Sequence, residues 1–283
     1  VVPRQLQAAG FDIETARALY GQLTGMAGSV VYFPNVIALA LSMSLVPAIS
    51  EAYALENREL VRSRSSIGIK LTILFSLPSA VGLFLLAEPI TTLLFNNAEA
   101  GFSLAYLSWS VISLCLYVTT TGLVQGLGRP IIPAVNMFYG GLVKTVIAWF
   151  LTAIPSLNVG GAALASVIGI GVAAALNLFQ VYRLTGWRAA WREDVILPSA
   201  ATLVMGLVVA GSYRGFALLT DFLASAGMAN MINTLGAIIL GAIIYGVMLV
   251  LTGAVSRDEL AMVPYVGKGL VRVLDKYNIK QLS

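Results

Sequence analysis

Seven long apolar stretches constrain this chain more than any other feature of its sequence. A helix needs about 20 apolar residues to cross the roughly 30 Å hydrocarbon core of a bilayer, and each stretch comes close to or exceeds that length. The runs are continuous rather than alternating, which favours helices over the strands of a membrane barrel. The sequence therefore predicts an all-α fold, a polytopic membrane helix bundle. The stretches cover approximately residues 23–50, 67–87, 102–124, 131–154, 159–182, 195–213 and 232–252.

The composition excludes several classes of function. Hydrophobic residues make up 58% of the 283 residues and charged residues only 11%, whereas a soluble domain is about 45–50% apolar. The chain contains no His and a single Cys, so a disulfide framework, a Cys/His zinc site and His-based acid–base catalysis are not expected. We predict no cofactor and no metal, and nothing in the sequence supports nucleic-acid binding.

Basic residues are distributed unevenly between the connecting segments. Cytoplasmic loops of membrane proteins are enriched in Lys and Arg, so we expect the basic side to be cytoplasmic, with the C-terminus inside and the N-terminal segment outside. An intact protein that starts in the cytoplasm would then need an odd number of spans before Val1, and we expect the chain to be a fragment that begins late. The side with fewer basic residues carries Arg4, Arg17 and Arg214. The side with more basic residues carries Arg58, Arg62, Arg64, Arg129, Arg183, Arg188, Arg192, Arg257, Lys268, Arg272, Lys276 and Lys280.

The residues after the last span predict a C-terminal amphipathic helix. Ser256 to Glu259 has the Ser-x-x-Glu form of a capping box, and apolar residues then recur at helical spacing among Lys268, Arg272 and Lys276. A basic amphipathic helix of this kind would lie on the anionic inner leaflet. We prefer the simpler interpretation, a docked tail that anchors the C-terminus.

One lysine, Lys144, lies near the middle of the otherwise apolar span 131–154. A charge at mid-bilayer costs on the order of 3 kcal/mol, so it usually faces a bundle interior or a water-filled cavity. Mostly small residues share its helical face, and four aromatic residues oppose it. We expect Lys144 to point inward; the alternative is that it reaches an interface or neutralises an acid, although the seven predicted spans contain no Asp or Glu. Its face includes Asn136, Met137, Gly140, Gly141, Ala148 and Leu151, and the opposite side carries Phe138, Tyr139, Leu142, Val146, Trp149 and Phe150.

Other polar and small residues in the spans allow two interpretations. Polar residues in or at the ends of spans could line a polar path or simply form hydrogen bonds in packed interfaces. Ala165, Gly169 and Ala173 recur at intervals of four, a spacing that lets two helices approach closely, and we interpret it as packing. The candidate cavity-lining residues are Asn35, Gln125, Asn136 and Asn177.

Two acidic pairs, Glu193–Asp194 and Asp258–Glu259, lie at span ends beside arginines. They could be read as carboxylates of a membrane-bound glycosyltransferase. Because no other convergent catalytic groups accompany them, we interpret both pairs as helix-end charges.

Six strings in the first 182 residues carry a family resemblance: VVPRQLQAAG, LYGQLTGMA, SLVPAISEAYAL, LPSAVGLFLLAEPITTLLF, GLVQGLGRPIIPA and VKTVIAWFLTAIPSLNVGGAALAS. In this order they resemble the second half of the stage V sporulation protein B family. That family is a polysaccharide-biosynthesis branch of the multidrug/oligosaccharidyl-lipid/polysaccharide (MOP) exporter superfamily and is related to the lipid II flippases.

The resemblance implies a domain organisation. Members have about fourteen spans in two lobes around a central cavity, so this chain would be the C-terminal lobe of a MOP-type flippase and would lack the N-terminal lobe of the same protein. Residues 1–22 would be the outer end of a preceding span and an extracytoplasmic segment, and 23–182 a core of five spans. Two additional spans would lie in 183–252 and a cytoplasmic amphipathic tail in 253–283.

The resemblance also implies a function and a first site residue. The protein would be a transporter, not an enzyme, of the bacterial plasma membrane. It would flip an undecaprenyl-pyrophosphate-linked oligosaccharide or a lipid II-like peptidoglycan precursor by alternating access, in cell-wall, polysaccharide or spore-cortex biosynthesis. Lys144 matches a basic position of the family's eleventh span. Such a cation stabilises a pyrophosphate through charge-assisted hydrogen bonds. Asn136, on the same face, and Arg4, at the outer mouth, are further candidates for the head group.

Three alternatives remain at this stage. A multidrug or cation antiporter of the same superfamily would need an intramembrane carboxylate, which these spans lack. A non-transporting membrane scaffold for cell-wall synthesis is the second alternative, and the membrane transferase is the third.

Overall fold

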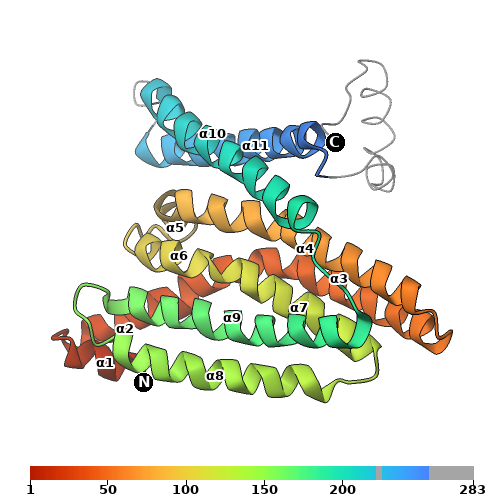
Figure 1. Ribbon diagram of the computed structural model, residues 1–283. Helices are drawn as coiled ribbons and strands as arrows, with labels where there is room; N and C mark the ends of the chain where they lie inside the picture. The colour runs from red at the N-terminus through yellow and green to blue at the C-terminus, as the bar shows by residue number, and fades with distance from the viewer. Residues whose placement is uncertain (221–224, 255–283) are drawn as a thin grey trace. The chain divides into compact units, whose positions relative to one another are not determined.

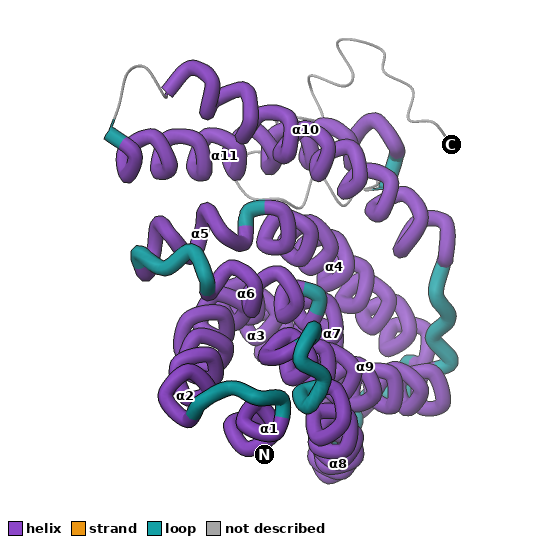
Figure 2. The backbone as a smooth tube through the Cα atoms, turned by 90° about the vertical axis from the view of Figure 1, so that its left-hand side faces the viewer, coloured by secondary structure: helices purple, strands orange, loops and turns teal. Residues whose placement is uncertain are grey.

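The computed structural model describes residues 1–220 and 225–254. All regular secondary structure in these residues is helical, as the tube in Figure 2 shows, and the prediction of an all-α fold is confirmed. Six helices are long and apolar enough to cross a membrane, and a bent pair raises this number to seven in the described residues. The predicted amphipathic tail from Ser256 onward, with the pair Asp258–Glu259, lies outside the described residues.

The chain forms two compact units, which are described separately. The first comprises Val1–Ala189 and the second begins at Ala190. The division expected from the sequence, between residues 182 and 183, falls within the last helix of the first unit, α9 (Asn158–Thr185).

The first long helix of unit 1 begins earlier than the apolar pattern predicts. The carboxylate of Asp12 accepts hydrogen bonds from the backbone N–H groups of Glu14 and Thr15, both at 3.0 Å, and this N-cap starts α2 (Ile13–Gly21). A π-helical turn, η1 (Gln22–Ala27), joins α2 to α3 (Gly28–Ala54). The result is a helix of 42 residues.

The predicted span 102–124 is a bent pair of helices. The helices α6 and α7 meet at Trp109 at an angle of 49°. Every other predicted span lies mostly within one long helix, although 67–87 runs past the end of its helix at Leu85 and 131–154 past the end of its helix at Leu151. The remaining helices of unit 1 are α1 (Val2–Ala8), α4 (Arg58–Leu85), α5 (Ala87–Phe95), α6 (Ala100–Ser108), α7 (Ser110–Gly126) and α8 (Ile131–Leu151).

Helix α7 forms the centre of unit 1, where it packs against α3, α4 and α9 (Figure 1). Glycines permit the closest approach: a Cβ atom added at Gly126 would lie only 2.8 Å from Cβ of Ile49 on α3. Helix α8 packs mainly on α9 and leaves its other side exposed. The helix that carries Lys144 therefore lies at the periphery of unit 1.

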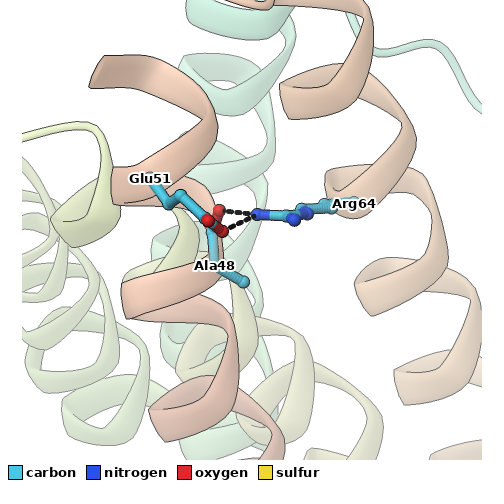
Figure 3. A network of polar contacts seen from close by, with 3 residues as sticks. All are labelled: Ala48, Glu51 and Arg64. Carbon is cyan, nitrogen blue, oxygen red and sulfur yellow. Dashed lines mark hydrogen bonds and ion pairs between the residues drawn. The ribbon is translucent and has the colours of Figure 1, made fainter. Parts of the chain in front are cut away.

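An ion pair connects α3 to α4 near one end of unit 1. The Nη1 atom of Arg64 lies 3.1 Å from Oε2 of Glu51 and also donates a hydrogen bond to the carbonyl of Ala48 (Figure 3). The side chains of Arg64 and Glu51 are 29% and 65% exposed, so the pair contributes at most about 1 kcal/mol. Apolar packing contributes more: Ile49 of α3, Leu123 of α7 and Val181 of α9 belong to a cluster of buried residues that also includes residues of α4.

Unit 2 is a pair of long helices in the residues described. A π-helical segment, η2 (Trp191–Ile196), leads into α10 (Leu197–Thr220), which packs along α11 (Ala226–Thr252). The hydroxyl of Tyr213 donates to Oδ1 of Asn230 at 3.2 Å, and that of Thr220 to Oδ1 of Asn233 at 3.1 Å. Hydrogen bonds between side chains therefore link the two helices near the end where α10 stops.

Candidate functional site

The faces of α8 differ in burial as the sequence predicts. Asn136, Gly140 and Ala148, assigned to the face of Lys144, are buried, whereas Lys144 itself, Met137 and Gly141 of the same face are exposed. Every residue assigned to the opposite face is exposed, an arrangement expected where a helix borders lipid. These exposed residues are Phe138, Tyr139, Leu142, Val146, Trp149 and Phe150.

The lysine face of α8 packs tightly on α9 through two glycines. A Cβ atom added at Gly140 would lie 2.5 Å from the carbonyl oxygen of Gly169 and 2.9 Å from Cβ of Ala173. A Cβ atom added at Gly169 would lie 2.5 Å from Cβ of Lys144. All three distances are well below ordinary contact, so the backbones approach more closely than larger residues would allow. The spacing of Ala165, Gly169 and Ala173 therefore serves packing, as the sequence indicated.

The Cβ atom of Lys144 lies in the contact between α8 and α9, whereas the rest of its side chain extends out of that contact. Its Cβ lies against Gly169, yet the residue as a whole is exposed. Its ammonium forms no ion pair or hydrogen bond with any other residue in 1–220 or 225–254. The backbone on either side is fixed by close helix packing, while the charged end remains available to another group.

Asn136 and Asn177 form a buried polar cluster with α7. Nδ2 of Asn136 donates to Oδ1 of Asn177 at 2.8 Å, and Nδ2 of Asn177 donates to Oγ1 of Thr121 at 3.1 Å and to the carbonyl of Tyr117 at 3.5 Å. The two asparagines are 7% and 0% exposed. These hydrogen bonds join α7, α8 and α9 where unpaired polar groups would be costly.

The cluster is separate from Lys144. Asn136 precedes Lys144 by two helical turns, a rise of about 12 Å along α8. The structure therefore brings Asn136 and Asn177 together but does not bring either amide to the ammonium.

The other predicted site residues lie apart from the contact between α8 and α9. Arg4 is exposed on α1, and Gln125 is exposed near the end of α7. Asn35 is half-buried on α3, and its Oδ1 atom has no hydrogen-bond partner among the described residues. No hydrogen bond joins any of the three to Lys144 or to the two asparagines in this part of the chain.

Thr121 and the carbonyl of Tyr117 belong to the polar cluster, and the sequence did not indicate them. They are four residues apart, which places them one turn apart on α7. Their partner Asn177 follows Thr121 by 56 positions. No local spacing links the groups, so only the packing of three helices reveals the cluster.

Acidic groups do not gather into a metal site in the described part of the chain. Within residues 1–220 and 225–254, no three His, Cys, Asp or Glu side chains come together in a way that could hold a metal ion. The carboxylate of Asp194 accepts the backbone N–H of Ala190 at 2.9 Å at the start of η2, an interaction typical of a helix-end acid.

Comparison with known proteins identifies the family. The family model described as "Lipid II flippase MurJ" matches residues 27–224, well over half of the chain. This chain belongs to the MurJ family. The resemblance to stage V sporulation protein B is also confirmed: that protein of Bacillus subtilis (strain 168) is 27% identical over 272 residues, covering 96% of this chain and 51% of its own length.

A further relative and a solved structure agree with the assignment. The lipid II flippase MurJ of Bacillus subtilis (strain 168) is 22% identical over 209 residues, 72% of this chain and 37% of the relative. A structure of lipid II flippase MurJ in an inward closed conformation matches with a TM-score of 0.63 at 19% identity, over 81% of this chain and 46% of the other. The chain is therefore a multi-pass membrane protein with the MurJ fold, and it spans between 37% and 51% of the length of these relatives.

Proposed function

We propose that this MurJ-family chain forms part of a flippase that moves a lipid-linked sugar precursor across the bacterial plasma membrane by alternating access. The family match and the shared fold support a flippase. One relative is described as a lipid II flippase, and we propose an undecaprenyl-pyrophosphate-linked oligosaccharide or a lipid II-like peptidoglycan precursor as the substrate of this protein. Because the relatives are about twice as long, we propose that an N-terminal lobe of the same protein completes the transport cavity.

Lys144 is the proposed contact for the anionic head group. The observation that supports this role is an exposed cation within the span α8, without a described hydrogen-bond or ion-pair partner. A lysine at such a depth costs on the order of 3 kcal/mol if it faces hydrocarbon, and a pyrophosphate would offset that cost through charge-assisted hydrogen bonds. Arg4, Asn136, Asn35, Gln125 and Asn177 stay predictions of the sequence.

The proposed orientation places the C-terminus in the cytoplasm. Arginines occur at the start of α4, in the turn between α7 and α8 and at the end of α9, and these three places lie at the same end of unit 1 (Figure 1). Since cytoplasmic segments are enriched in such residues, this end would face the cytoplasm. Accessibility labelling of single cysteines introduced at Arg62 and at Arg17 in intact cells would test the assignment.

The test of the site uses the intact protein reconstituted in vesicles with a fluorescent lipid-linked pyrophosphate sugar. Lys144→Ala should reduce flipping at least about tenfold, because one charge-assisted hydrogen bond contributes about 1.5–3 kcal/mol. Lys144→Arg should retain part of the activity since it keeps the charge. Transport equal to that of the wild-type protein in Lys144→Ala would show that the proposed role is wrong.

Thr145→Ala is the matched control on the same helix. The Thr145 hydroxyl donates to the carbonyl of Gly141 within α8 at 2.8 Å, so its removal changes the adjacent position without changing a charge. Transport should be unaffected in this variant. If both variants lose flipping equally, disturbance of α8 and not loss of the ammonium is the cause.

A further inference from the structure

A pocket at one end of unit 1 collects three arginines from three separate parts of the chain. Arg58 comes from the start of α4, Arg129 from the turn between α7 and α8, and Arg183 from the last turn of α9. The pocket has a volume of about 860 Å³ and is called the basic pocket below. Arg129 is separated from Lys144 by about 20 Å along α8, so the basic pocket is distinct from the proposed transport site.

The arginines of the basic pocket lack carboxylate partners in the described part of the chain. Arg58, Arg129 and Arg183 are exposed and form no ion pair with any residue of 1–220 or 225–254. The nearby carboxylate of Glu51 is already paired with Arg64. Glu56 is the single acidic residue among those that line the pocket. The lining therefore has an excess of positive charge.

The helix ends around the basic pocket do not cancel this excess. The C-terminal ends of α3, α7 and α9 meet there, and a helix C-terminus is equivalent to about half a negative charge. The helices α4 and α8 begin immediately after two of these ends, and their N-termini offset them. What remains is about half a negative charge from α9, much less than the three guanidinium groups carry.

The walls of the basic pocket are fixed by packing and by turn geometry. Val61 and Leu127 line the pocket and belong to the buried apolar cluster beneath it. The turns after α3, α7 and α9 each contain one residue with positive φ: Glu56 at 53°, Gly128 at 74° and Gly186 at 68°. These left-handed residues end three helices at the rim, so the arginines project from defined backbone positions.

We propose that the basic pocket binds the phosphate head group of an anionic lipid. A guanidinium group presents paired N–H donors that match phosphate oxygens. The volume falls within the roughly 300–1,000 Å³ of ligand sites, larger than a free phosphate needs and sufficient for a phosphate with its polar substituent. The location where helices end is where lipid head groups are found. The head group comes either from an anionic phospholipid of the bilayer or from an isoprenoid pyrophosphate.

The experiment measures equilibrium binding to the intact purified protein by native mass spectrometry. The probes are a short-chain phosphatidylglycerol, farnesyl pyrophosphate, and a short-chain phosphatidylcholine as the zwitterionic comparator. Arg58→Gln, Arg129→Gln and Arg183→Gln should each weaken binding of an anionic probe by about three- to tenfold, since exposed charged contacts contribute modestly. In a Lys144→Ala background, which removes the pyrophosphate contact proposed above, the triple variant should lose specific binding.

Two further variants separate a site from general surface charge. Arg62→Gln removes an exposed arginine of α4 that does not line the pocket, and it should leave binding unchanged. Glu56→Gln removes the acidic residue of the lining, so it should strengthen binding. A structural disturbance would weaken binding in either variant, so the stronger binding expected for Glu56→Gln is diagnostic even if the triple variant is too unstable to purify.

The outcome also distinguishes the source of the head group. Preference for phosphatidylglycerol over phosphatidylcholine would assign the basic pocket to bilayer lipid, and preference for farnesyl pyrophosphate would assign it to an isoprenoid carrier. The proposal is overturned if neither anionic probe binds, if Arg62→Gln weakens binding as much as Arg129→Gln does, or if Glu56→Gln weakens it. None of these outcomes depends on flipping, so the test is independent of the function proposed for Lys144.

Discussion

The close contact between α8 and α9 predicts that a single methyl group at Gly169 destabilises the protein. In Gly169→Ala the new Cβ would lie 2.5 Å from Cβ of Lys144 and 2.7 Å from the carbonyl of Gly140. Ordinary carbon contacts are about 3.5–4.0 Å, so the two helices must separate locally by about 1 Å. Overpacking of this kind costs about 1–3 kcal/mol, whereas replacement of glycine by alanine in a helix gains about 0.5–1 kcal/mol.

The expected net loss is therefore up to about 2.5 kcal/mol, which for a chain of 283 residues corresponds to a fall of up to about 4 °C in the midpoint of thermal unfolding. Circular dichroism of the intact protein in detergent measures it. Gly171→Ala is the matched control on the same helix, because its Cβ would meet only Oγ of Ser113 at 3.5 Å. That variant should match or exceed the stability of the wild-type protein. Equal midpoints for Gly169→Ala and Gly171→Ala would refute the argument from close packing.

Two further predictions follow from polar contacts. Asn177→Ala should lower the free energy of unfolding by about 1–3 kcal/mol because it leaves buried polar groups unpaired. A double-mutant cycle with Asn136→Ala, measured by thermal unfolding, should give a coupling energy of at least about 0.5 kcal/mol. Additive losses of stability would contradict a direct hydrogen bond between the two side chains. At Asp12, hydrogen bonds from the Thr15 hydroxyl, and then from its backbone N–H, lower the pKa of the carboxyl. This cap therefore stabilises the fold above the usual Asp pKa of about 3.9 and loses its effect as the pH falls through the lower folded-state value. The midpoint of wild-type unfolding should fall relative to that of Asp12→Asn over this interval, and parallel curves would contradict the assignment.

The sequence predicts the spans because each is a long apolar run. Hydrocarbon offers no hydrogen-bond partner to the backbone N–H and C=O groups of such a run, so only a helix or a closed barrel can satisfy them. It predicts their ends less well. The start of α2 is decided by the cap at Asp12, in a segment whose composition is mixed. The bend at Trp109 is marked by no proline, the residue that most often identifies a kink in a sequence.

The site is predictable only where one helix determines it. The two faces of α8 follow from periodicity alone, since the side-chain positions repeat every 3.6 residues. The polar cluster depends on three helices, so no pattern within one segment indicates that Asn177 bonds to Thr121. The same holds for the basic pocket: charge counting places Arg58, Arg129 and Arg183 on one side of the membrane, and only tertiary packing makes them neighbours.

The helix that runs from Ile13 to Ala54 is longer than the hydrocarbon core of a bilayer requires. Its 42 residues would extend about 63 Å if straight, whereas a span tilted by as much as about 40° crosses a 30 Å hydrocarbon layer with roughly 26 residues. About 16 residues must then lie beyond the acyl chains. The charged residues Glu14, Arg17 and Glu51 lie near the two ends, which can emerge into water or head groups. Part of this helix therefore extends beyond the hydrocarbon core, and a tilt of 10° about mid-membrane would move a point 30 Å away by about 5 Å.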